Sequence, residues 1–293
     1  MAPRRHTRHT VRVVGRVTRR VPSTRVVVED PGSPVVSSRP DTLAVEEPLE
    51  IRVGGDSIYV TMRTPGDDFD LAIGYLLTEG VVPGADAVHH AMHCLDEDET
   101  GSPTFNVVDI TLAPGTLVDT SRTERTGSYT SSACGVCGKT SIDAITTKSR
   151  YAVAHDPVRL SPDVVAGLPD ALRAQQKVFD RTGGLHAAGV FTADGELLAV
   201  REDVGRHNAV DKVVGWAGRE GLLPLAGHVL VVSGRASFEL TQKAVMAGIP
   251  VLASVSAPSS LAVDLAQESG MTLVGFVRPP RLTVYAGGHR LGL

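Results

Sequence analysis

The sequence predicts an α/β protein made of a disordered basic arm (1–40), a small α+β domain (41–128) and a larger α/β domain (151–293). A cysteine-containing loop and helix (129–150) join the two domains. Strand and helix patterns alternate after Gly183, which is typical of a mostly parallel, helix-covered sheet. The small domain instead shows hairpin patterns around a single helix, and the arm is rich in Arg, Pro and Ser.

Length and composition limit the possible classes of protein. At 293 residues and 42% hydrophobic content, the chain can bury a substantial core. Its three cysteines are too few for a disulfide framework, and the sequence shows no apolar signal segment and no apolar run of about 18 residues. We therefore expect a cytoplasmic protein without a membrane segment.

The net charge of −4 conceals a strong asymmetry along the chain. Residues 1–25 contain eight arginines and no acidic residue, whereas the remainder has 21 basic against 33 acidic residues. An acidic body argues against a nucleic-acid-binding surface. The arm could contact RNA or an anionic partner, but arms of this composition are usually solvated, and only 25–29 has a strand pattern.

Local patterns predict each element of the small domain. Alternating residues over 49–53 and 57–61 flank Gly54, Gly55 and Asp56, which is typical of a hairpin. A helix is expected to open near 64–68 and to end at Gly80. A second strand pair is expected over 87–92 and 105–112.

The larger domain is expected to begin with a helix over 164–179, capped by Ser161, followed by a strand pair across Asp194 and Gly195. The strands of that pair are 187–193 and 196–201. Further helices are expected over 206–220, 236–247 and 259–268, and further strands over 228–232, 251–255, 272–277 and 282–285.

Polar residues follow three of these strands. The segments are Ser233 to Arg235, Ser256 to Ser260, and Arg278 to Arg281. Ligands in such sheets bind at the carboxyl ends of strands, and hydroxyls, helix N-termini and arginines suit phosphates. Because neither a P-loop nor a Gly-x-Gly-x-x-Gly turn is present, the sequence predicts a phosphate-bearing ligand held without either loop.

Cys134 and Cys137 form a Cys-x-x-Cys pair in a glycine-flanked turn. Such a pair can be half of a zinc site, a redox dithiol or a nucleophile with a helper. Zinc needs two further ligands, and the adjacent His93 and Cys94 are not spaced as a metal knuckle. A helix predicted over 139–148 would favour a thiolate at its N-terminus. We therefore favour a nucleophilic Cys134 able to carry a persulfide, with Cys137 as a resolving or supporting thiol, and no bound metal.

Two histidine-containing motifs remain ambiguous. His186 lies in a Gly-rich segment that resembles a deaminase motif, but Ala188 replaces the essential Glu, so His186 could be a site residue or a core histidine. In the segment 202–212, Arg206 and His207 could face a ligand, or Asp203 could simply cap the following helix.

Taken together, six segments resemble the formate dehydrogenase accessory sulfurtransferase (FdhD) family. The matching segments are ACGVCG (133–138), GGLHAAG (183–189), EDVGRHNAVDK (202–212), SGRASFELTQKA (233–244), SAPSSLAV (256–263) and TLVGFVRPPRLTVY (272–285). The resemblance implies a homodimeric sulfurtransferase that takes sulfur from a cysteine desulfurase. It would pass the sulfur to the molybdenum (or tungsten) bis-pterin guanine dinucleotide cofactor of formate dehydrogenase. It also implies a three-layer, cytidine-deaminase-like C-terminal domain.

The resemblance also assigns site residues. Cys134 matches the persulfide cysteine, and the segment Phe276, Val277, Arg278, Pro279, Pro280 and Arg281 matches the cofactor-binding stretch. The arginines of that segment suit the dinucleotide phosphates, whereas Val277 and Pro280 are expected to contribute backbone only. The remaining candidates for cofactor binding are His186, Arg206, His207, Ser233 and Arg235. Two alternatives to a sulfurtransferase stay open, a non-catalytic cofactor-binding chaperone and, more weakly, a nucleoside deaminase.

Overall fold

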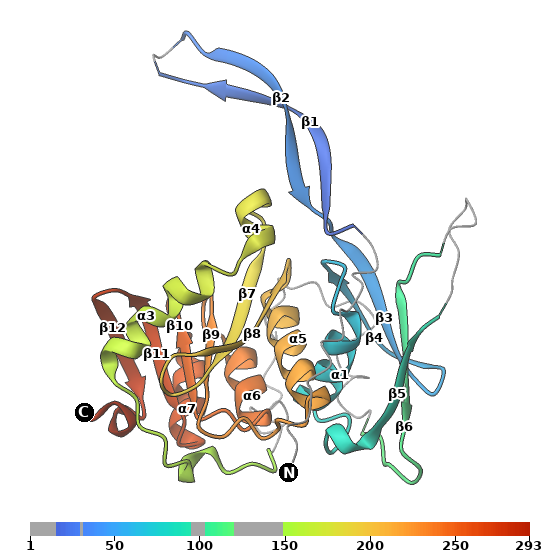
Figure 1. The fold of residues 1–293 in the computed structure, drawn as a ribbon, viewed down its shortest axis with the longest axis vertical. Helices are drawn as coiled ribbons and strands as arrows, with labels where there is room; N and C mark the ends of the chain where they lie inside the picture. The colour runs from blue at the N-terminus through green and yellow to red at the C-terminus, as the bar shows by residue number, and fades with distance from the viewer. Residues whose placement is uncertain (1–15, 30–31, 95–102, 120–148) are drawn as a thin grey trace, which may run out of the picture.

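The computed structural model describes residues 16–29, 32–94, 103–119 and 149–293, which form a mixed α/β fold (Figure 1). The strands of these residues make two larger sheets and a separate two-stranded ribbon. No helix in the described segments is long and apolar enough to cross a membrane.

The smaller sheet has the strand order β4-β3-β6-β5. The predicted hairpin is confirmed, because β3 (Glu47–Val53) and β4 (Asp56–Arg63) pair antiparallel across a Gly-Gly turn. The second predicted pair is confirmed as β5 (Val88–His93) and β6 (Val107–Leu112), which are antiparallel to each other, and β6 runs parallel to β3. Alternate residues of β3 are buried, so one apolar face of this sheet turns inward.

The larger sheet has the order β12-β11-β10-β9-β7-β8. Its strands are β7 (His186–Phe191), β8 (Leu197–Asp203), β9 (Val229–Val232), β10 (Val251–Ser254), β11 (Thr272–Arg278) and β12 (Arg281–Ala286). Two of its five ladders are parallel, β9 with β10 and β10 with β11, and the other three are antiparallel. The prediction of a mostly parallel sheet was wrong, because short turns join β7 to β8 and β11 to β12, and such turns make neighbouring strands antiparallel.

Three helices alternate with the strands after β8 as predicted, namely α5 (Arg206–Arg219), α6 (Phe238–Met246) and α7 (Ser260–Glu268). The last two begin at serine N-caps whose hydroxyl oxygens accept a backbone N–H from the first turn. Ser161 occupies the N-cap of α3 (Pro162–Arg173), but its side chain makes no capping hydrogen bond.

The helix predicted over 164–179 is two helices in the structure, α3 and α4 (Lys177–Thr182). The interruption has a tertiary cause. Glu202 on β8 accepts hydrogen bonds from two backbone N–H groups in the first turn of α4, at 2.8 and 2.9 Å. This carboxylate provides the N-terminal cap that starts a second helix with a new direction.

Both faces of the larger sheet carry an apolar core. Residues of α3 pack against one face, and residues of α5, α6 and α7 pack against the other. The second core continues through α1 (Asp68–Thr78) into the smaller sheet, so the two predicted domains share it. The cytidine-deaminase-like arrangement implied by the resemblance stays a prediction.

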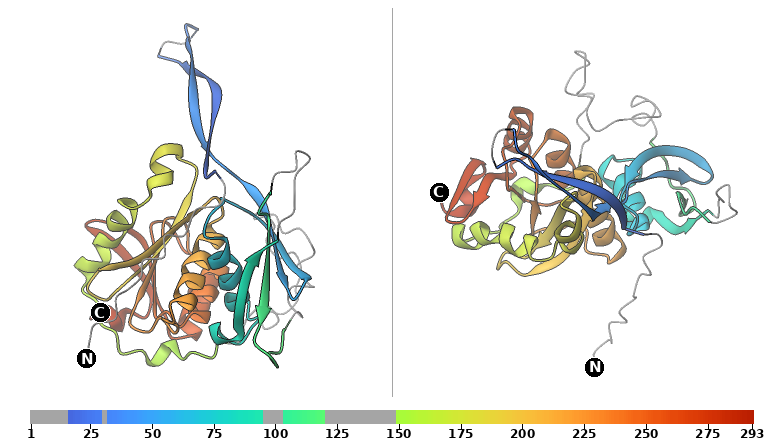
Figure 2. Two further views of the ribbon diagram at one scale, coloured as in Figure 1. Left: turned by 45° about the vertical axis from the view of Figure 1, so that its right-hand side comes forward. Right: turned by 90° about the horizontal axis from the view of Figure 1, so that it is seen from above.

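Helices α1 and α5 lie side by side between the two larger sheets (Figures 1 and 2). Glycines face each other where they cross. A Cβ added to Gly74 would lie 1.8 Å from the backbone oxygen of Asp211, and one added to Gly215 would lie 1.8 Å from that of Asp70. The backbones approach this closely because neither position carries a side chain.

Ion pairs that each include at least one buried side chain stabilise the same junction. They join Asp70 with Arg201 and Arg219, Asp203 with Lys212, and Asp211 and Glu79 with Lys243. Burial raises the pKa of the Asp211 carboxyl to about 6. Although burial opposes it, the carboxylates of Asp211 and Glu79 raise the pKa of Lys243, so the ammonium stays charged.

Three short 3-10 helices complete the described structure, η1 (Ala85–Ala87), η3 (Val153–His155) and η4 (Gly288–Leu291). Arg290 in η4 is fully buried. Its guanidinium donates to the carbonyl oxygens of Gly270 (2.9 Å) and Val153 (2.7 Å), which ties this end of the chain to the larger sheet.

The expectation of a mostly disordered arm was wrong for the part that the structure describes. β1 (Thr18–Val27) and β2 (Val35–Ala44) form a ten-pair antiparallel ribbon that stands away from both sheets (Figures 1 and 2). Composition predicted disorder because Arg, Ser and Pro lie between the valines of these strands. The backbone hydrogen bonds that pair the strands do not depend on side-chain type.

Candidate functional site

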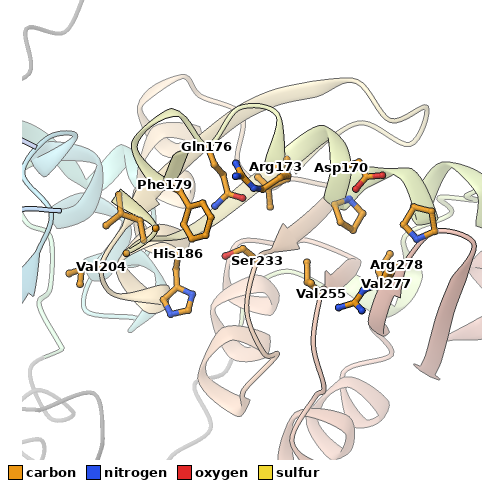
Figure 3. Close-up of a pocket in the computed structure, with 16 residues that line it drawn as sticks. Asp170, Arg173, Gln176, Phe179, His186, Val204, Ser233, Val255, Val277 and Arg278 are labelled. Carbon is orange, nitrogen blue, oxygen red and sulfur yellow. The ribbon is translucent and has the colours of Figure 1, made fainter. Parts of the chain in front are cut away.

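The carboxyl ends of β9, β10 and β11 meet at one edge of the larger sheet because these strands are parallel. β7 is antiparallel to β9, so its first residue, His186, lies at the same edge. A cavity of about 580 Å³ opens there (Figure 3). Among the residues that line it are His186, Ser233, Val277, Arg278 and Pro279. The structure therefore brings together five of the candidates predicted from the sequence.

The opposite wall of the cavity comes from α3, α4 and the turn between them. Figure 3 shows Asp170, Arg173, Gln176 and Phe179 along this side, across from Ser233 and its neighbours on the sheet edge. The Arg173 guanidinium lies 4.8 Å from the centre of the Phe179 ring and also pairs with the carboxylate of Asp180 on α4. These contacts, with the Glu202 cap of α4, hold the wall in place.

Two guanidinium groups make the cavity suitable for an anion. Among the described residues that line it, Arg173 and Arg278 are accompanied by one carboxylate, that of Asp170. Ser233 Oγ accepts a hydrogen bond from the backbone N–H of Ala187 at 2.9 Å, which leaves its hydroxyl proton available to a ligand. Burial, and then the charge of Arg206, lower the pKa of His186, so its imidazole is neutral at pH 7. The lining can thus donate to phosphate oxygens from charged and neutral groups.

Phe276 in β11 does not line the cavity, although the next residue, Val277, does. It has a positive φ of 51° and a side chain that is 50% exposed, and its backbone N–H donates to Ser256 O at 3.1 Å. An aromatic ring held in the open at the edge of a binding site can stack on a flat heterocycle. Pro280, Arg281 and Arg235 do not line the cavity, and Arg281 begins β12.

Arg206 and His207 also lie outside the cavity, in the first turn of α5. His207 Nε2 is 3.9 Å from Glu239 Oε2 on α6. Burial first, and then the charges of Lys243 and Arg206, lower the pKa of His207 to about 4. In the described part of the chain, His207 Nε2 and Arg206 Nε are buried without a hydrogen-bond partner. A ligand role for these two residues stays a prediction.

The polarity of the surrounding motif has a structural explanation. Asp203 is fully buried, accepts from Gly205 N and Asn208 Nδ2, and receives the backbone N–H of Thr64 from the smaller part of the molecule. Lys212 pairs with it at 2.7 Å. Asp203 therefore joins the two parts of the protein, and the N-cap of α5 is Gly205 instead.

Cys134, Cys137 and the helix predicted after them lie outside the described residues. Cys94 follows β5 with a free thiol of intermediate exposure, and its backbone N–H donates to Val107 O at 3.0 Å. Within the segments that the structure describes, no three His, Cys, Asp or Glu side chains gather in a way that could hold a metal ion. This observation does not extend to the cysteine pair.

Sequence reasoning missed Arg173, Phe179, Gln176 and Asp170. They were assigned to a single long helix, in which Arg173 and Phe179 would not share a ligand-facing wall. The available signal was Glu202, an acidic residue next to the end of a strand, where its carboxylate can cap another element. Only the fold shows that the capped element is α4.

The chain is similar to known proteins along most of its length. Residues 44–292 match the model of the FdhD/NarQ family. The sequence is 58% identical over 281 residues to the sulfur carrier protein FdhD of Streptomyces avermitilis, covering 96% of this chain and 98% of that protein. It is 57% identical over 262 residues to the protein of the same name from Mycobacterium tuberculosis, covering 87% and 94%.

A solved structure has a similar fold. It is the crystal structure of a candidate formate dehydrogenase accessory protein from Desulfotalea psychrophila, which matches with a TM-score of 0.69. The match covers 93% of this chain and 99% of that one, at 23% identity. At this level of identity the likeness concerns the fold alone.

Proposed function

Because the chain belongs to the FdhD/NarQ family, we propose that it is a sulfur carrier for formate dehydrogenase. It accepts sulfane sulfur from a cysteine desulfurase as a persulfide on Cys134. It then transfers that sulfur to the molybdenum (or tungsten) bis-pterin guanine dinucleotide cofactor destined for the dehydrogenase. The names of the relatives support the role of sulfur carrier. The structural observation that supports binding of the acceptor cofactor is the cavity lined by Arg173 and Arg278.

The first transfer balances without an added oxidant. The Cys134 thiolate attacks the outer sulfur of the donor persulfide, a new S–S bond forms on Cys134, and the donor S–S bond breaks. The electron pair of the broken bond leaves with the donor cysteine as its thiolate, so the sulfane sulfur keeps its oxidation state. Cys137 is a supporting thiol in this proposal. Because the protein passes sulfur from a donor to an acceptor, it acts as a sulfurtransferase.

The acceptor would be bound as a substrate. A volume of about 580 Å³ lies within the range of small-molecule sites, roughly 300–1,000 Å³, and suits one nucleotide portion of the larger cofactor. Arg278 and Arg173 would meet the phosphates, and Ser233 and neutral His186 would complete the polar contacts. Phe276, which is exposed and adjacent in sequence to the lining residue Val277, would offer its ring for stacking on the guanine or pterin. The proposal includes the homodimer that the resemblance implies.

Incubation of the full-length protein with a cysteine desulfurase and cysteine is expected to add the mass of one sulfur atom to the peptide that contains Cys134. Alkylation that traps persulfides followed by peptide mass spectrometry measures this. Cys134→Ala should remove the signal, and Cys94→Ala should leave it unchanged. Sulfur found on Cys94 alone would contradict the assignment. Full rescue of formate dehydrogenase activity by Cys134→Ala would favour the alternative, a non-catalytic cofactor chaperone.

Arg278→Ala is expected to weaken the binding of guanosine diphosphate at least tenfold, because it removes a charge-assisted contact inside the cavity. Calorimetry or fluorescence titration at fixed ionic strength measures the Kd. Arg281→Ala is the matched control, since Arg281 lies three residues along the same segment but outside the cavity, and we expect less than a threefold change. Equal losses from both variants would show that long-range charge, and not the cavity, determines binding.

A further inference from the structure

A second cavity lies apart from the one that contains Arg278. It is lined by residues of α1, η1, β5 and the C-terminal end of α5, on the side of the molecule that holds the smaller sheet (Figure 1). Its volume is about 450 Å³, which is within the range of roughly 300–1,000 Å³ found for small-molecule sites. The two cavities have no lining residue in common, so the sulfur transfer proposed above leaves this one without a role.

One wall of this second cavity is apolar and fixed by the core. Phe69 and Ile73 lie one turn apart on α1, and Val88 and Ala91 face them from β5. Ile73 belongs to the buried core, and the other three pack against it. The ring of His93 lies behind the Phe69 ring, with 4.7 Å between the ring centres. A ligand with a flat or branched apolar body would therefore meet a preformed surface.

Two adjacent histidines, His89 and His90, also line the cavity. In a regular strand the side chains of neighbouring residues point to opposite faces. Here the pairing of β5 with β6 shifts by one residue between Val88↔Leu112 and His90↔Thr111, so His89 is an extra residue in a bulge. β5 is an edge strand, and a bulge there redirects side chains. Both histidines are exposed, and an imidazole ring always carries at least one N–H that can donate to an anion.

Arg219 supplies a fixed positive charge beside the histidines. Its Nη1 donates to Asp70 Oδ1 at 2.6 Å, while its side chain stays 41% exposed. That contact leaves others of the five guanidinium N–H donors available to a ligand. Asp70 is 2% exposed and also pairs with Arg201, so two guanidinium groups already offset its charge. The buried carboxylate therefore orients Arg219 without cancelling its attraction for an anion.

We propose that this cavity binds a small carboxylate that has an apolar body, such as an aromatic or branched-chain acid. Among the described residues that line it there is no acidic side chain, whereas Arg219, His89 and His90 all offer N–H donors. A planar carboxylate matches the planar guanidinium fork, and the apolar body lies against Phe69 and Ile73. The inference is independent of the proposed sulfur transfer.

NMR titration of the full-length protein with benzoate at fixed ionic strength tests the proposal. The expected Kd is about 1 mM, as suits a ligand of this size. Benzamide lacks the charge and acetate lacks the apolar body, so both should bind about tenfold more weakly or worse. Arg219→Lys keeps a cation beside Asp70 but loses the fork, and we expect it to raise the benzoate Kd about fivefold or more. His89→Ala with His90→Ala, which changes only exposed side chains, should do the same.

Arg159→Lys and His155→Ala are the matched controls, because they change the same residue types at exposed positions that do not line the cavity. They should leave the benzoate Kd unchanged within about twofold. Saturating guanosine diphosphate and Arg278→Ala should also leave it unchanged, which separates this cavity from the first. No binding at about 10 mM benzoate, equal affinity for benzoate and benzamide, or displacement of benzoate by guanosine diphosphate would each overturn the proposal.

Discussion

Gly215→Ala is expected to destabilise the protein by about 3 kcal/mol or more, and Gly74→Ala to do the same. The added methyl group would overlap a backbone oxygen of the facing helix, at 1.8 Å in each case. A backbone oxygen in a packed helix cannot rotate away as a side chain can, so α1 and α5 would have to separate. The ion pairs of Asp70 and Asp211 at this junction would then be strained as well. Urea unfolding measured at a constant m-value gives the change.

Gly167→Ala is the matched control for this prediction. Gly167 lies inside α3, is exposed, and has open space where a Cβ would be added. The same chemical change should therefore stabilise the protein by about 0.5–1 kcal/mol through helix propensity. A loss at Gly215 no larger than the change at Gly167 would mean that the two helices do not cross as closely as the structure shows.

Lys243→Met is expected to cost about 3–5 kcal/mol of unfolding free energy. The Lys243 ammonium is buried, lies 2.9 Å from Asp211 Oδ1 and 2.7 Å from Glu79 Oε1, and also donates to Thr78 Oγ1. Methionine fills most of the volume but leaves the carboxylate of Asp211 charged in an apolar surrounding. Thermal or chemical unfolding of the variant beside the wild type measures the loss.

The loss of unfolding free energy caused by Lys243→Met should depend on pH in a defined direction. Burial already raises the pKa of Asp211 from its usual 3.8 to about 6, and loss of the ammonium raises it further. A carboxyl group whose pKa is higher in the folded than in the unfolded state stabilises the folded protein in acid. This stabilisation is lost as the pH rises from the unfolded-state pKa to the folded-state pKa. The stability difference between variant and wild type should therefore be smallest below about pH 6, where Asp211 is protonated in both folded proteins, and should grow as the pH rises above 6.

Asp211→Asn added to Lys243→Met is the control for this charge argument. The amide is neutral and can still accept the hydrogen bond from Thr78 Oγ1, so no unpaired charge remains buried. The double variant should recover most of the loss and should show little of the pH dependence. A double variant as unstable as the sum of both single changes would instead indicate that packing of the lysine stem dominates.

Elements whose signal is local were predictable. The hairpin at Gly54 and Gly55 and the second strand pair of the smaller sheet follow from alternation and turn residues. Helices α5 to α7 follow from the helical period, and α6 and α7 also have serine caps. For the same reason the sheet edge with Ser233 and Arg278 could be anticipated as a site, because parallel strands place their carboxyl ends together.

Features created by distant residues were not predictable. The split of 164–179 depends on Glu202, and the parallel or antiparallel sense of each ladder depends on how the connections fold back. The β1–β2 ribbon was taken for disorder because a ladder of backbone hydrogen bonds leaves little trace in composition. Arg281 and Arg278 are alike in sequence context, yet only Arg278 lines the cavity.

The amino-acid sequence by itself determined the α/β class, the order of most strands and helices, the family and the chemical types needed for a phosphate-bearing ligand. These are properties of local periodicity, caps and motif residues, which act over a few positions of the chain. The tertiary structure alone decided which arginines share the cavity, how α4 forms its wall, and how closely α1 and α5 pack. Those outcomes depend on contacts between residues that are distant in the sequence. Glu202 caps α4 from 24 positions away, and Gly74 with Asp211 and Thr64 with Asp203 are more than a hundred positions apart.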